Sequence, residues 1–95
     1  MYQVYLARCK DGTLYTGVSK NVEQRIYQHN NSNKGAKYTR SRRPVFLVWT
    51  SSHLTKSAAL KLEHKIKKLN KQNKEGLVAG NFNIYSDDVN CSTIR

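Results

Sequence analysis

The sequence predicts one α/β (α+β) domain with the element order β-β-α-β-α. Three observations favour it: two strand-like segments around an Asp-Gly turn at 4–9 and 14–18, an apolar run at 45–50, and helical periodicity at 22–30 and again from 55 onward. The chain has 95 residues, enough for one modest core. We therefore expect a domain at 1–76, followed by a short polar tail at 77–95 where the periodicity fails.

The first two strands form a predicted β-hairpin, rich in β-branched and aromatic residues. Because side chains alternate between the faces of a strand, the length of the turn decides where Tyr5 and Tyr15 point. A two-residue turn of Asp11 and Gly12 places the tyrosines on opposite faces. A turn with an odd number of residues, or a bulge, places both on one face.

The first helix begins after Asn21, which forms a capping-box pattern with Gln24. We expect this helix over 22–30, with Arg25 and His29 at neighbouring positions on its surface. The run at 45–50 follows Pro44 and is apolar throughout except at its end, which predicts the central strand of the sheet.

The second helix begins near Thr55 or Ser57, since either side chain can cap it. Its apolar stripe packs on the sheet and consists of Ala58/Ala59, Leu62, Ile66 and Leu69. Glu63 is the only acid on this helix, and it borders the stripe, so we expect it to be partly shielded from water.

The charge of the chain indicates a polyanionic partner. Lysine and arginine number 17 against 6 acids, a net charge of +11. The basic side chains gather in a loop at 34–43 and in two lysine rows along the second helix, Lys61-Lys65-Lys68 and Lys67-Lys71-Lys74. The predicted phosphate contacts are Lys37, Arg40, Arg42, Arg43, Lys67 and Lys71.

Several classes of protein are disfavoured. No segment approaches the ~18 apolar residues of a membrane span, and no signal peptide begins the chain. The stripe of the second helix lacks aromatic anchors for a membrane surface. Cys9 and Cys91 are far apart and form no Cys-x-x-Cys pair, which indicates a reduced, cytoplasmic protein rather than a disulfide scaffold or zinc site.

The candidate catalytic residues are ordinary one by one, because strand tyrosines usually pack and helical Arg, His and Glu are usually solvated. Their order is more specific. It runs Tyr5, Tyr15-x-Gly17, Arg25-x-x-x-His29 and then Glu63, and over about residues 2–75 it resembles the GIY-YIG nuclease family, most closely its small stand-alone bacterial members. The central motif positions differ, as Gln3-Val4-Tyr5 and Tyr15-Thr16-Gly17. No clear match exists for the family's asparagine among Asn70, Asn73, Asn81 and Asn83.

The resemblance implies a three-stranded antiparallel sheet flanked by helices, with Tyr5 and Tyr15 on one face, and therefore the odd-numbered or bulged turn. It implies that Glu63 holds one divalent ion, magnesium or alternatively manganese, and that Arg25 binds the scissile phosphate. One tyrosine would activate the water, and which one is open. His29 would relay protons or contact phosphate.

The predicted function is therefore a metal-dependent endonuclease acting in DNA repair or processing, with RNA as a second possible substrate. Nothing in the chain suggests a recognition helix or zinc finger, so cleavage would be structure-directed or weakly sequence-selective, with targeting by a protein partner. The alternative is a non-catalytic nucleic-acid-binding module on the same fold. Glu63 discriminates between them, because pure phosphate binding has no use for a carboxylate.

Overall fold

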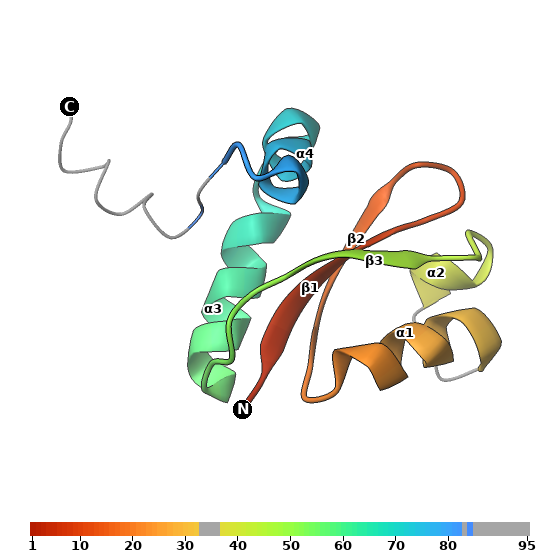
Figure 1. The fold of residues 1–95 in the computed structure, drawn as a ribbon, viewed down its shortest axis with the longest axis horizontal. Helices are drawn as coiled ribbons and strands as arrows, with labels where there is room; N and C mark the ends of the chain where they lie inside the picture. Colours follow the sequence, from red (N-terminus) through yellow and green to blue (C-terminus); the bar gives the residue numbers. More distant parts are fainter. Residues whose placement is uncertain (33–36, 83, 85–95) are drawn as a thin grey trace, which may run out of the picture.

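The structure is a computed structural model that describes residues 1–32, 37–82 and 84 of the chain. Within these residues, three strands and four helices follow one another (Figure 1). In chain order they are β1 (Gln3–Arg8), β2 (Leu14–Ser19), α1 (Val22–Asn31), α2 (Lys37–Arg40), β3 (Phe46–Thr50), α3 (Lys56–Lys67) and α4 (Lys71–Ala79).

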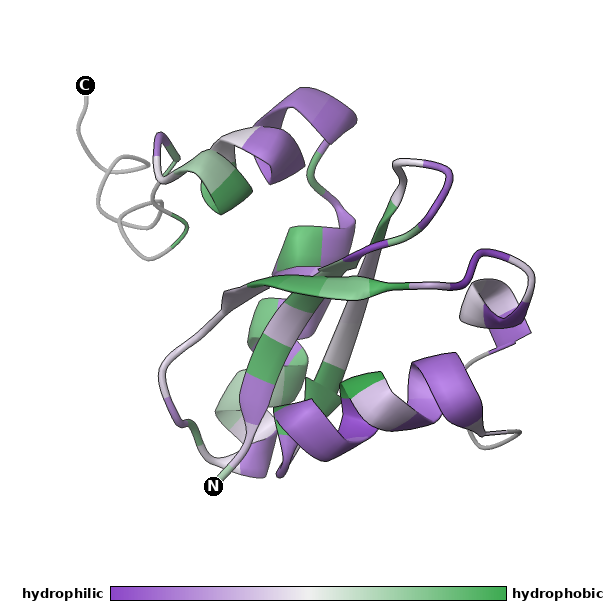
Figure 2. Cartoon of the chain, turned by 45° about the vertical axis from the view of Figure 1, so that its right-hand side comes forward, coloured by the Kyte–Doolittle hydropathy of each residue, from purple (hydrophilic) through white to green (hydrophobic). Residues whose placement is uncertain are grey.

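The strands form one antiparallel sheet with the order β2-β1-β3, which confirms the predicted α+β architecture. The prediction that 45–50 is the central strand is wrong, because β1 lies between the other two. The residues of β1 from Val4 to Ala7 are all buried, since helices cover both of its faces. By contrast β3 is an edge strand that is largely apolar, yet Phe46 is 60% exposed (Figure 2). An apolar run therefore did not identify the most buried strand.

The hairpin has the odd-numbered turn that the sequence analysis expected. Tyr5 pairs with Gly17 and Ala7 with Tyr15, so both tyrosines lie on the same face of the sheet. The N–H of Cys9 donates to the carbonyl of Thr13 at 2.8 Å, which leaves residues 10–12 in the turn. Gly12 closes it with φ of +88°, a conformation that glycine adopts without strain.

The sheet separates two apolar clusters. On one face Val4 and Leu6 pack against α3 and α4, in a cluster whose other fully buried members are Ala59, Ile66, Leu77 and Ile84. On the other face Tyr5, Ala7 and Cys9 pack against Val22 of α1 and against Val45. Of the candidate catalytic side chains, Tyr5 and Tyr15 belong to the second face together with α1, which carries Arg25 and His29, while Glu63 comes from α3, the helix that packs on the first face.

The helices α1 and α3 begin directly after capping side chains that the sequence suggested. Asn21 caps α1 by accepting a hydrogen bond from the N–H of Gln24, at 3.1 Å. Of the two candidates for the next helix, Thr55 is the cap of α3, and its hydroxyl accepts from the N–H of Ala58 at 3.2 Å.

The predicted second helix is in fact two helices. The chain leaves α3 at Lys68, and the side chain of Asn70 then caps α4 by accepting from the N–H of Asn73 at 2.8 Å. The row Lys67-Lys71-Lys74 therefore does not lie on one helix, since a new cap interrupts the periodicity.

The expected end of the domain at residue 76 falls inside α4. Leu77 and Ile84, beyond that position, are buried in the core cluster on the α3 face. Gly80 ends α4 in the left-handed conformation, with φ of +85°. Residues 85–95 of the expected tail, and Asn83, lie outside the described residues.

Candidate active site

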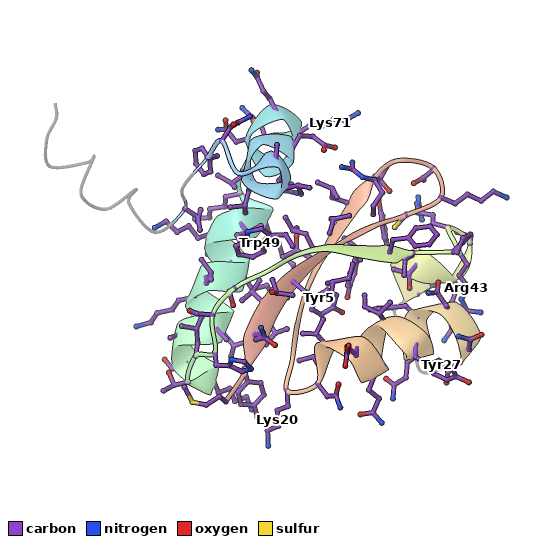
Figure 3. The ribbon with its side chains drawn as sticks, viewed as in Figure 1. Tyr5, Lys20, Tyr27, Arg43, Trp49 and Lys71 are labelled. Carbon is purple, nitrogen blue, oxygen red and sulfur yellow. The ribbon has the colours of Figure 1, made fainter. Side chains whose placement is uncertain are left out.

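Three aromatic rings from three elements meet on the α1 face of the sheet. The ring of Tyr15 lies 6.3 Å from that of Tyr5 and 5.1 Å from the imidazole of His29, measured between ring centroids. The rings of Tyr5 and His29 are 6.0 Å apart. Tyr5 lies near the centre of the molecule (Figure 3). The odd-numbered turn places the two tyrosines on one face, and α1 packs on that face with His29. Residues that are distant in the sequence are thus brought together.

Gly17 is needed because the ring of Tyr5 crosses directly over it. A Cβ atom at Gly17 would lie 2.5 Å from both Cζ and the hydroxyl oxygen of Tyr5, closer than atoms can approach. The absence of a side chain on β2 therefore lets the Tyr5 hydroxyl extend across the neighbouring strand. This gives a physical reason for the Tyr15-x-Gly17 spacing in the sequence.

His29 is fully buried between two hydroxyl groups. Its Nε2 lies 2.7 Å from the hydroxyl of Tyr5, and its Nδ1 lies 2.9 Å from the hydroxyl of Thr39 on α2. Thr39 is also fully buried. The sequence analysis missed Thr39, because a small polar residue in a basic segment carries no signal of its own.

Burial and nearby charges shift the pKa values of His29 and Tyr5. Burial lowers the pKa of His29 to about 4, and the charges of Arg25 and Arg43 act in the same direction. His29 is therefore neutral at pH 7. Burial raises the pKa of Tyr5 well above its usual value, and the positive charge of Arg25 opposes this rise. Tyr5 is therefore a protonated phenol at neutral pH.

The two charged candidates act on the Tyr5 hydroxyl from different helices. The positive charge of Arg25, on α1, opposes the rise in the pKa of Tyr5, while the carboxylate of Glu63, on α3, contributes weakly to that rise. The Glu63 side chain is 20% exposed, as the sequence analysis expected for a partly shielded acid, and its Oε2 lies 3.2 Å from the ammonium of Lys67. All five predicted catalytic residues thus lie in one region of the molecule.

A shallow groove of about 350 Å³ opens beside Tyr15. Tyr38 of α2 stacks on Tyr15 with a centroid distance of 6.0 Å and forms part of the same wall. Two lysines, Lys67 of α3 and Lys74 of α4, also line it. A second hollow of about 190 Å³ shares Lys74 and adds Lys71. The two hollows therefore form a path with positive charge that begins at Tyr15.

Several of the predicted phosphate contacts have structural partners. The guanidinium of Arg43 donates to the carbonyl oxygens of His29 and Ser32, at the end of α1. Arg42 lies 4.0 Å above the ring of Tyr38 and forms a 3.0 Å ion pair with Asp11. The side chains of Lys37, Arg40, Lys67 and Lys71 are exposed, and Lys67 pairs with Glu63.

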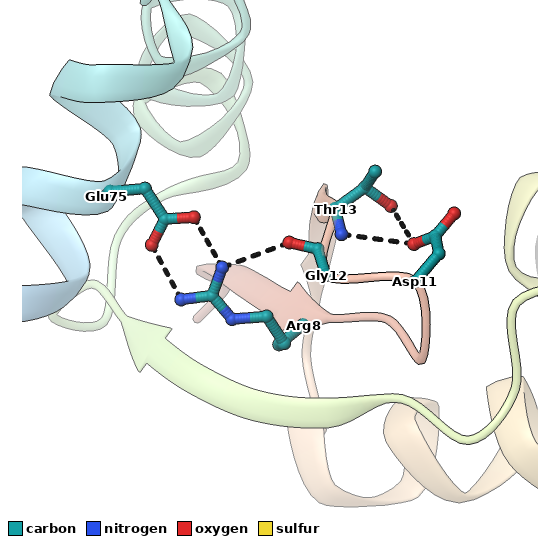
Figure 4. A network of polar contacts seen from close by, with 5 residues as sticks. All are labelled: Arg8, Asp11, Gly12, Thr13 and Glu75. Atoms are coloured by element: carbon teal, nitrogen blue, oxygen red, sulfur yellow. Dashed lines mark hydrogen bonds and ion pairs between the residues drawn. The ribbon is translucent and has the colours of Figure 1, made fainter.

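An ion pair fastens α4 beside the hairpin. Both oxygens of Glu75 accept hydrogen bonds from the guanidinium of Arg8, one of them at 2.6 Å (Figure 4). The same guanidinium donates to the carbonyl of Gly12 at 3.1 Å. This contact holds the start of α4, with Lys71 and Lys74, near the hairpin turn.

Glu63 is the acid that the described part of the chain offers for a metal ion in this region. No group of three His, Cys, Asp or Glu side chains occurs among the described residues. A hydrated magnesium ion fits a single carboxylate, because it keeps most of its waters. Glu63 already attracts one cation, the ammonium of Lys67.

No helix among the described residues is long and apolar enough to cross a membrane.

Comparison with known proteins places this geometry in a family. The GIY-YIG catalytic domain matches residues 1–76. A UPF0213 protein of Staphylococcus saprophyticus is 50% identical over 78 residues, which cover 82% of this chain and 94% of the relative. A UPF0213 protein of Natronomonas pharaonis is 51% identical over 78 residues, covering 82% and 91%.

Two solved structures are also similar to this chain. The solution NMR structure of a UPF0213 protein from Bacillus halodurans has 41% sequence identity and a TM-score of 0.54, covering 99% of this chain and all of the other. The solution NMR structure of a protein from E. faecalis has 34% identity and a TM-score of 0.55, covering 99% and 91%. The resemblance seen in the sequence is confirmed: the chain belongs to the GIY-YIG catalytic domain family, a nuclease-type family.

Proposed function

We propose that this protein is a metal-dependent endonuclease that hydrolyses DNA phosphodiester bonds. The observation that carries the proposal is the convergence of Tyr5, Tyr15 and His29 on one sheet face, with the positive charge of Arg25 acting on the Tyr5 hydroxyl. These residues come from β1, β2 and α1, so neither a single helix nor a single strand explains their meeting. The chain's charge of +11 and the groove lysines supply the attraction for a polyanion.

The two tyrosines take different parts in this proposal. Tyr5 is 1% exposed and protonated, so it serves as a fixed hydrogen-bonding group rather than as a base. Tyr15 is half-buried and lines the groove, where it meets the attacking water and accepts or orients its proton. Because His29 is neutral, it holds Tyr5 by a hydrogen bond rather than pairing with phosphate as a cation.

In this proposal, Arg25 and a metal ion held by Glu63 stabilise the negative charge of the transition state. Arg25 binds the scissile phosphate through its planar fork of N–H groups. Glu63 would hold the magnesium ion, with manganese as the alternative. When bound, such an ion stabilises negative charge on the phosphate and lowers the pKa of a coordinated water. Lys67 and Lys74 hold the neighbouring phosphates of the strand.

The substrate in this proposal is DNA, with RNA as the second polyanion that the same groups would bind. Phosphate contacts dominate the path, so recognition depends on the shape of the nucleic acid more than on its bases. A role in DNA repair or processing, with a protein partner supplying targeting, follows from this weak selectivity.

The test is cleavage of end-labelled single-stranded, duplex and branched DNA with magnesium or manganese. We expect Glu63→Gln to bind DNA with unreduced affinity and to cleave at least a hundredfold more slowly than the unchanged protein. Glu23→Gln is the matched control, since it removes the same charge at an exposed position of α1. Equal cleavage by both variants would contradict the proposal.

The second candidate function is a binding module that does not cut. The 3.2 Å pair between Lys67 and Glu63 favours it, because an i, i+4 ion pair is an ordinary way to stabilise a helix surface. The same experiment decides: DNA binding without metal-dependent cleavage by any of the three proteins would support this function.

A further inference from the structure

His29 is held at both of its ring nitrogens by hydroxyl groups from other elements. The Tyr5 hydroxyl on β1 lies 2.7 Å from Nε2, and the Thr39 hydroxyl on α2 lies 2.9 Å from Nδ1. The exposed fraction of Thr39 and of His29 is 0%, and that of Tyr5 is 1%. The contact between Thr39 and His29 is therefore sheltered from competing water.

The donors and acceptors around Tyr5 indicate where the protons lie. Of the two hydroxyls beside the imidazole, the Tyr5 phenol is the stronger acid and therefore the better donor, and the nearby positive charge of Arg25 favours the same orientation. The phenol proton is then directed at Nε2 of His29. A neutral imidazole that accepts at one nitrogen carries its proton on the other. Nδ1 of His29 therefore donates to the hydroxyl oxygen of Thr39.

We propose that Thr39 is a positioning residue that fixes the tautomer of His29. By accepting the Nδ1 proton, Thr39 leaves Nε2 as the acceptor for the Tyr5 hydroxyl. The lone pairs of the Tyr5 oxygen thereby remain available to the nearby charge of Arg25. The effect on catalysis rests on the proposed nuclease function, whereas the tautomer of His29 does not.

The segment that carries Thr39 is anchored well enough to hold this contact. Within it, the Arg42 N–H donates to the carbonyl of Thr39 at 3.0 Å, and the Arg42 guanidinium donates to the carbonyl of Tyr38 at 2.8 Å. The hairpin turn then fixes Arg42, because Asp11 pairs with its side chain at 3.0 Å and the N–H of Lys10 donates to its carbonyl at 2.9 Å.

The first test is the ¹⁵N–¹H spectrum of the imidazole groups, which distinguishes protonation at Nδ1 from protonation at Nε2. We expect the His29 proton on Nδ1 in the unchanged protein and in Thr39→Ser, which keeps the hydroxyl. Thr39→Val has nearly the same shape without an acceptor, so we expect it to populate the form with the proton on Nε2. A proton on Nε2 in the unchanged protein overturns the proposal, and so does an unchanged tautomer in the valine variant.

The second test is the rate of DNA cleavage by the same three proteins. We expect the kcat of Thr39→Val to fall about tenfold or more, with DNA affinity unchanged because the groove lysines are intact, and Thr39→Ser to restore most of the rate. A shifted tautomer with an undiminished rate contradicts the positioning role. If no protein cleaves DNA, the proposed function fails, and the spectra still decide whether Thr39 sets the tautomer.

Discussion

At the residue scale, Gly17 shows how one missing side chain admits another. We expect Gly17→Ala to destabilise the fold by about 1–3 kcal/mol, because the new methyl group overlaps the ring of Tyr5. The cost should largely disappear when Tyr5 is also replaced by alanine. A double-mutant cycle in urea measures this coupling. Additive effects of the two substitutions would show that the ring and the glycine do not meet.

The buried His29 makes stability depend on pH. Its pKa in the fold is about 4, below the value of 6.5 for a histidine in the unfolded chain, so the unfolded chain binds the proton more readily. The stability from neutral His29 is complete above pH 6.5 and is lost as the pH falls toward 4. The loss amounts to about 3 kcal/mol, since a tenfold change in proton affinity corresponds to about 1.4 kcal/mol.

Urea unfolding between pH 7 and 4 checks this dependence. His29→Gln should remove most of the change in unfolding free energy with pH, while His53→Gln, at an exposed position, should keep it. A slope that survives in His29→Gln would assign the pH dependence to other groups.

At the scale of elements, the pair between Arg8 and Glu75 determines how firmly α4 is attached. Both side chains are about one-third exposed, so solvent screens the pair and its loss should cost only about 0.5–1 kcal/mol. We expect Glu75→Gln to speed amide hydrogen exchange in α4 more than in β1. The exposed Glu23→Gln serves as the control, and equal protection of α4 in both variants would assign its docking to Leu77 and the core alone.

The elements also show what the sequence could predict. Local signals sufficed for the helix cap at Asn21 and for the strands of the hairpin, because neighbouring residues decide those features, and they narrowed the next cap to Thr55 or Ser57. The strand order depends on packing between distant segments. The apolar run of β3 therefore led to the wrong prediction that it is the central strand. The α2 helix has four residues in a basic segment, too few for periodicity, and Thr39 was missed with it. The resemblance, rather than periodicity, suggested that Tyr5, Tyr15, Arg25, His29 and Glu63 act together.

At the scale of the whole molecule, the net charge of +11 should govern DNA affinity. We expect affinity to fall steeply with salt, and Lys71→Gln to reduce the slope of log K against log salt by about 0.9 on duplex DNA, the value for one lost phosphate contact. Lys20→Gln removes the same charge at the opposite end of the molecule, beside Tyr2, and should leave the slope unchanged (Figure 3). Equal slopes for both variants would remove Lys71 from the binding path.

The position of the groove on the sheet has a consequence for what can reach it. Tyr15 lies on β2, an edge strand, and the groove beside it is shallow and open to solvent. A polymer can be laid into such a groove from the side, without being threaded through it. The site therefore places no demand on a free chain terminus, and a covalently closed circle is as accessible to it as a linear strand.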